Sequence, residues 1–193
     1  TEVGAAADKQ QLYEAFTHES TVLRKEYSRK LTQRHQLMQE QAQVAWEERF
    51  AQSQAEFTAN VADFEASLAA EAAAMQQKLK ERYLNPILNT KLQLAIVSLT
   101  EEQRLELTEK LERLSQEYEI MKTEYAKELE TAFSEFQSAE GERQKQQMLA
   151  WEQEQTARLE QEYANFQAQI ELELNQEIEK LEATLRRAVN ARE

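Results

Sequence analysis

The chain has 193 residues, of which only two are glycine and one is proline, and 31% are charged. This composition is typical of long helices or coiled coils and excludes a loop-rich globule, while the 41% hydrophobic content is too high for a disordered chain. The net charge of −13 argues against nucleic acid and anionic membranes as partners, because both bind basic surfaces.

The first long element is predicted to be a helical arm over residues 10–85, preceded by an N-terminal tail at 1–9. Neither proline nor glycine interrupts this arm, and the apolar residues of its second half recur every three or four positions. That spacing keeps them on one helical face. We expect the arm to end at Asn85, because Pro86 lacks an amide hydrogen and disfavours helix in the residue before it.

Residues 86–99 form the predicted tip and are more apolar than their flanks. The β-branched pair Ile96 and Val97 is also compatible with a strand at this position. A short helix is favoured, because Leu88 and Leu92 share one helical face with the apolar residues that follow them.

Residues 100–193 are the predicted second arm. Thr100 lies three residues before Gln103, which is the spacing of an N-terminal capping box. A heptad seam begins at Leu107, and an eleven-residue spacing farther along indicates that the supercoil unwinds there. Gly141 is the predicted weak point of this arm.

Two arms of similar length on either side of one break predict an all-α fold, a long antiparallel helical hairpin with coiled-coil packing and a short helix or turn at the tip. A reversal near residues 93–98 places Trp46 near Trp151, and the basic stripe at 24–34 opposite the acidic region at 160–173. Each exposed charge pair would contribute less than about 1 kcal/mol. Seams of this kind suit a monomer, a dimer or a trimer equally well. The sequence therefore does not decide whether the protein forms a homo-oligomer.

The residue types that catalysis needs are scarce. The chain has no cysteine, and its two histidines, His18 and His35, lack the neighbours that a metal site requires. It has no glycine-rich phosphate loop and no nucleophile elbow. We therefore expect a protein that is not an enzyme and has no metal or cofactor site. No apolar run is long enough to span a membrane.

Large aromatic residues are the remaining candidates for a binding surface. Aromatic residues at helical spacing usually pack in a core. Those that face outward could instead hold exposed apolar segments of another protein. The candidate protein-binding residues are Trp46, Phe50, Phe57, Phe64, Phe133, Phe136 and Trp151.

Two stretches resemble the Skp/OmpH-like family of periplasmic chaperones. Val3–Asp8 (VGAAAD), followed by Leu12–Phe16 (LYEAF), is similar to the short strand and long helix that open those proteins. Tyr83–Leu88 (YLNPIL) is similar to a Leu-x-Pro-Ile segment of some members. The resemblance implies helical arms that cradle unfolded outer-membrane proteins, a small β-rich oligomerisation core, and a periplasmic or cell-envelope location.

The sequence therefore favours two functions, and both involve binding to other proteins. The first is a chaperone or holdase-like protein of the cell envelope that binds unfolded or membrane-destined proteins. The second is a structural coiled-coil scaffold or spacer with one specific partner. For the protein as a whole, a cytoplasmic location is the alternative to the cell envelope. Aromatic residues that face outward favour the first function, and a fully buried seam favours the second.

Overall fold

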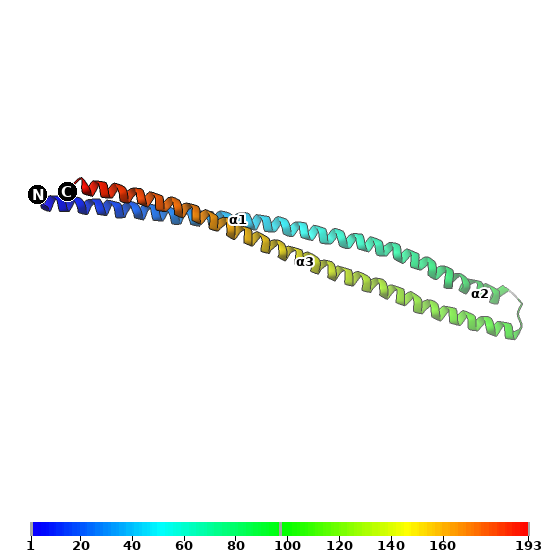
Figure 1. The fold of residues 1–193 in the computed structure, drawn as a ribbon. Coiled ribbons are helices and arrows are strands. Elements are labelled where there is room, and N and C mark those ends of the chain that lie inside the picture. Colours follow the sequence, from blue (N-terminus) through cyan, green and yellow to red (C-terminus); the bar gives the residue numbers. More distant parts are fainter. Residues whose placement is uncertain (1, 97, 193) are drawn as a thin grey trace. The chain divides into compact units, whose positions relative to one another are not determined.

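The computed structural model describes residues 2–96 and 98–192. These residues form three α-helices and one π-helical turn and contain no strand (Figure 1). In chain order the elements are α1 (Glu2–Leu79), η1 (Lys80–Leu84), α2 (Asn85–Ile96) and α3 (Glu101–Asn190). The predicted all-α fold of paired helices with a short helix at the tip is confirmed. Thr1, Val97 and Glu193 were included in the predicted tail, tip and second arm and lie outside the described residues.

The chain divides into two compact units, each built from an antiparallel pair of helical segments. Unit 1 combines Thr1–Phe50 with Met148–Glu193, and unit 2 is the continuous stretch Ala51–Gln147. Unit 2 contains the reversal of the chain between α2 and α3, so it is a helical hairpin by itself.

In unit 1 the first part of α1 packs against the last part of α3. The ring of His35 meets that of Tyr163 edge-on, with 5.9 Å between their centroids. The guanidinium of Arg34 lies 5.1 Å above the centre of the Phe166 ring. Arg29, in the same basic stripe, forms an ion pair with Glu26 of its own helix. The basic stripe at 24–34 thus lies beside the 160–173 region of α3, as predicted. The contact shown by Arg34 is with the aromatic ring of Phe166.

The core of unit 2 lies near the tip. Leu79, Tyr83 and Ile87 are buried there. They pack against a row of partly buried side chains from the predicted heptad seam of α3, namely Leu111, Leu114, Tyr118, Met121 and Tyr125. The heptad pattern therefore identified the α3 side of this core.

Pro86 changes the type of helix and does not end it, so the expected stop at Asn85 is corrected. Before the proline, the amide of Asn85 donates to the carbonyl of Lys80, five residues back, which closes a π-helical turn. A proline cannot donate this backbone bond and its ring collides with the carbonyl four residues earlier. The wider π turn accommodates both effects, and the helix resumes as α2.

The start of the chain also differs from expectation. The predicted tail at 1–9 is helical from Glu2 onward, and no described residue there forms a strand. The opening strand and the β-rich core that the family resemblance implies are thus missing from the part of the chain that the structure describes. Three consecutive alanines after Gly4 explain this, because alanine has the highest helix propensity.

Helix α3 begins as predicted and continues past its glycine. The amide of Gln103 donates to the Thr100 hydroxyl (3.2 Å), and the amide of Thr100 donates to the Gln103 side chain (3.1 Å), so both halves of the capping box form. The helix passes through Gly141 without interruption. A single glycine costs a helix interior only about 1 kcal/mol relative to alanine, so the predicted weak point stays helical.

Candidate protein-binding surface

Two of the seven candidate aromatic residues face solvent in unit 1. Trp46 and Phe50 lie one turn apart on α1, with 37% and 43% of their surface exposed. Their rings stack almost in parallel, with centroids 5.1 Å apart. The indole Nε1 of Trp46 donates to Oε1 of Glu152 on α3 at 2.5 Å. This bond holds the indole against α3, and both rings stay partly exposed to solvent.

An open groove of about 330 Å³ lies beside this aromatic pair, between α1 and α3 of unit 1. Trp46 and Trp151 both line it, so the structure brings the two tryptophans together as the antiparallel register predicted. The small side chains of Ala42 and Ala45 leave the space unfilled. Apart from Leu159, charged and polar groups form the rest of its wall, including Glu152, Arg158 and Glu162.

A second groove in unit 1 shares part of this lining. It measures about 370 Å³ and is lined by His35, Met38 and Tyr163, among others. Both grooves include Ala42 and Leu159 in their walls. We call the two together the aromatic groove. An extended segment with apolar side chains could lie along it, because the lining combines aliphatic and aromatic carbon with scattered polar groups.

The candidate aromatic residues of unit 2 belong to its seam. The rings of Phe64 and Phe136 stack across the helix pair with centroids 4.0 Å apart. Phe57 packs against Gly141, where an added Cβ atom would lie 3.7 Å from the ring. All three are half-buried, as is Phe133. For these four residues the core interpretation holds, and they do not form an exposed binding surface.

A buried polar cluster in unit 2 was not predicted from the sequence. The carboxylate of Glu140 accepts hydrogen bonds from Asn60 of α1 at 2.7 Å and from Gln144 at 3.1 Å. It also accepts two from Arg143, at 2.9 and 2.6 Å. Hydrogen bonds from Arg143 and then from Asn60 lower the pKa of Glu140 to about 2, although burial of the carboxylate acts in the opposite direction. The carboxylate is therefore charged at any ordinary pH.

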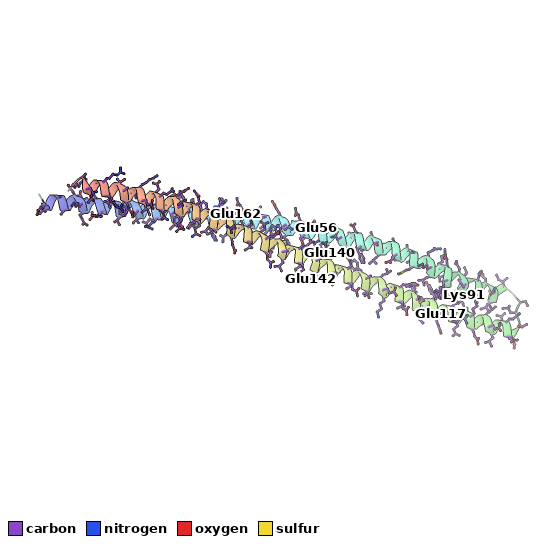
Figure 2. The ribbon with its side chains drawn as sticks, viewed as in Figure 1. Glu56, Lys91, Glu117, Glu140, Glu142 and Glu162 are labelled. Atoms are coloured by element: carbon purple, nitrogen blue, oxygen red, sulfur yellow. The ribbon has the colours of Figure 1, made fainter. Side chains whose placement is uncertain are left out.

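Gln144 connects this carboxylate to α1. Its side-chain oxygen accepts from the buried Ser53 hydroxyl at 3.1 Å, and its nitrogen donates to Glu56 at 3.3 Å. Figure 2 labels Glu56 on α1 and Glu140 on α3 where these helices run side by side. The available sequence signal was a gap in the apolar repeat of α3, where Glu140 and Gln144 occupy seam positions between Phe136 and Met148.

Such a cluster can fix the alignment of two helices. A slip by one turn would leave buried polar atoms without partners, which costs about 1–3 kcal/mol for each neutral group and more for a charged one. The cluster therefore holds the two helices in one register and does not resemble a catalytic site. Among the described residues, no group of three or more His, Asp or Glu side chains could hold a metal ion.

No helix in the described part of the chain is both long and apolar enough to cross a membrane. No protein-family model matches the chain, and no curated protein or solved structure matches it either. The surfaces of the two units are therefore the basis on which we infer function.

Proposed function

We propose that the chain is a non-enzymatic, holdase-like protein that binds unfolded or membrane-destined proteins along the aromatic groove of unit 1. The observation that carries this proposal is the stacked and exposed pair Trp46 and Phe50 at the edge of an open groove. Tryptophan dominates the energetics of protein interfaces, because it buries a large apolar area with little loss of conformational freedom.

The composition of the groove suits a client without a fixed sequence. Its apolar floor would accept many aliphatic or aromatic side chains, and the polar wall at Glu152, Arg158 and Glu162 stays hydrated. The proposed cell-envelope location and the outer-membrane clients follow from the Skp/OmpH-like resemblance alone.

The second candidate is a scaffold or spacer with one defined partner, and the buried polar cluster of unit 2 favours it. Hydrogen bonds from Ser53 to Gln144 and from Asn60 to Glu140 join the helix pair in one alignment, as a spacer of defined length requires. A scaffold does not need Trp46 and Phe50 to stay exposed, however, so the holdase is the first candidate.

The test is a dilution experiment with a urea-unfolded outer-membrane β-barrel protein, whose aggregation is followed by light scattering. We expect the protein at several-fold excess to suppress the scattering and to form a soluble complex of defined mass. The double variant Trp46→Ala/Phe50→Ala should lose most of this effect. Leu172→Ala is the matched control, because Leu172 also lies in unit 1 with 54% of its surface exposed but does not line either part of the groove.

One outcome separates the two candidates, and another tests the assigned site. Absence of suppression by the unmodified protein would reject the holdase and leave the scaffold. If the double variant protects as well as the unmodified protein, with circular dichroism showing that both are folded, the aromatic groove is not the client site.

A further inference from the structure

A second exposed apolar surface lies in unit 2, on η1 and α2. Leu84, Leu88, Leu92 and Ile96 follow one another at four-residue intervals, with 40%, 57%, 46% and 75% of their surface exposed. Side chains four residues apart lie on the same face of a helix. The four residues therefore form a continuous row of large aliphatic side chains, which we call the tip ridge.

The tip ridge is separate from the core of its unit. Tyr83, Ile87 and Thr90 are the buried residues of these elements. Leu84 and Leu88 each follow a buried residue by one position, which rotates them about 100° around the helix axis. The ridge is thus a second apolar face of the same helices, and α3 covers only the first.

The helices that carry the ridge are locally basic. η1 and α2, residues 80–96, contain Lys80, Arg82 and Lys91 and a single acid, Glu81, whereas the whole chain has a net charge of −13. Figure 2 labels Lys91 on α2. It lies three residues after Leu88 and one before Leu92, so it flanks the middle of the ridge. Lys80 lies four residues before Leu84 and extends the row with a positive charge.

These charges distinguish between the surfaces that could cover the ridge. Two copies of the chain that paired their ridges about a two-fold axis would bring their Lys91 side chains together near that axis, and like charges would oppose the contact. An anionic membrane is disfavoured by the neighbouring start of α3, where residues 101–117 contain six glutamates and three basic residues. A single acidic helix, about 10 Å wide, covers the ridge and Lys91 without extending over the start of α3, whereas a membrane surface is broad enough to face both.

We infer that the tip ridge docks an amphipathic helix of another protein, whose apolar stripe is flanked by Asp or Glu. Rows of residues spaced by four interdigitate when two helices cross, and this is a common way to seat an amphipathic helix on an apolar surface. A row of four side chains spans only about 18 Å of helix, so we expect a weak and reversible complex. This site is independent of the aromatic groove proposed for unfolded clients.

The test uses two synthetic helical peptides of about 21 residues, six turns of helix. Both present the same leucine stripe, flanked by glutamate in one peptide and by lysine in the other. Fluorescence anisotropy with the full chain should give a dissociation constant of roughly 1–100 μM for the glutamate peptide and at least tenfold weaker binding of the lysine peptide. Leu88→Ser/Leu92→Ser should weaken binding of the glutamate peptide at least tenfold. Leu172→Ser, on α3 of unit 1, is the control and should leave it unchanged.

A charge reversal tests the partner chemistry separately from folding. Lys91→Glu should weaken binding of the glutamate peptide and strengthen binding of the lysine peptide, which a loss of structure would not do. Equal binding of both peptides by the unmodified chain, or unchanged binding after Leu88→Ser/Leu92→Ser, would overturn the inference.

Two further outcomes would assign the ridge to another occupant and also overturn the inference. One is self-association in analytical ultracentrifugation that Leu88→Ser/Leu92→Ser abolishes, which would make the ridge a contact between copies. The other is binding to phosphatidylserine vesicles that depends on the same leucines, which would make it a lipid contact. Neither result bears on the scattering experiment with Trp46→Ala/Phe50→Ala, so the two proposals fail separately.

Discussion

At the scale of single residues, Glu140 shows how a charged side chain is kept between two helices. Its carboxylate has hydrogen bonds from both of them, through Asn60 on α1 and through Arg143 and Gln144 on α3. Replacement by glutamine keeps the shape but weakens these bonds. We expect Glu140→Gln to lower the free energy of unfolding by about 1–3 kcal/mol at pH 7, measured by urea denaturation. An unchanged midpoint would mean that the cluster does not stabilise unit 2.

The same carboxylate gives a prediction about pH. Its pKa is about 2 in the folded protein against 4.5 as the ordinary value, so it stabilises the fold above about pH 4.5 and loses this contribution as the pH falls toward 2. The difference in melting temperature between the unmodified protein and Glu140→Gln should therefore shrink over this range. Glu142→Gln removes one charge from the same helix outside the cluster and serves as the control. A difference that stays constant from pH 7 to pH 2 would contradict the assignment.

Gly141 occupies a position where alanine would be better. It lies inside α3 with no positive φ, and an added Cβ atom would meet Phe57 at an ordinary contact distance of 3.7 Å. Because glycine loses more backbone entropy than alanine on forming a helix, Gly141→Ala should stabilise the protein by about 0.5–1 kcal/mol. Ala139→Gly, at an exposed position two residues before Gly141, should destabilise the protein by a similar amount. A lower melting temperature for Gly141→Ala would show that Phe57 requires the bare backbone.

At the scale of elements, the start of α3 depends on its capping box. Thr100→Ala removes the hydroxyl that accepts the Gln103 amide and should cost about 1 kcal/mol, measured by thermal melting. Because Thr100 and Gln103 act reciprocally, their double replacement by alanine should cost less than the sum of the two single changes. Additive effects would indicate that the cap hydrogen bonds contribute independently.

The elements also show which signals the sequence carries. Long helices, the α3 seam from Leu107 onward and the capping box follow from local composition and spacing, and all three were predictable. The π turn before Pro86 was not, because its formation depends on tertiary packing that holds Tyr83 and Ile87 against α3 on both sides of the proline. A proline rule based on isolated helices predicts a stop at that position.

The candidate site was predictable only in part, for a related reason. Spacing places all seven aromatic residues near the seam but does not show which of them have room to pack inward. Phe64 and Phe136 meet each other across the seam, whereas Trp46 hydrogen-bonds at the edge and leaves Phe50 stacked outside. The polar cluster escaped prediction because Glu and Gln are common throughout the chain, and only pairing across helices distinguishes Glu140 and Gln144 from the exposed ones.

At the scale of the whole molecule, the core is small for the length of the chain. The described residues of the two units contain few buried hydrophobic side chains, namely Met38, Leu79, Tyr83, Ile87, Met148 and Ile170. Two-helix seams bury only one stripe of each helix, so large apolar side chains such as Leu37, Val44 and Ile120 stay about half exposed. The heat capacity change on unfolding depends on the area that becomes exposed.

This thin core gives a thermodynamic prediction for the isolated chain. We expect differential scanning calorimetry to give a heat capacity change of about 10 cal/mol/K per residue or less, below the usual 12–15, because less apolar surface is hidden in the folded state. If single chains are the folded species, the melting temperature should also be independent of protein concentration. A melting temperature that rises with concentration, together with a heat capacity change in the usual range, would show that copies of the chain bury further surface against one another. The tip ridge would then be the first contact to test, because Leu88→Ser/Leu92→Ser should remove the concentration dependence if that surface forms it.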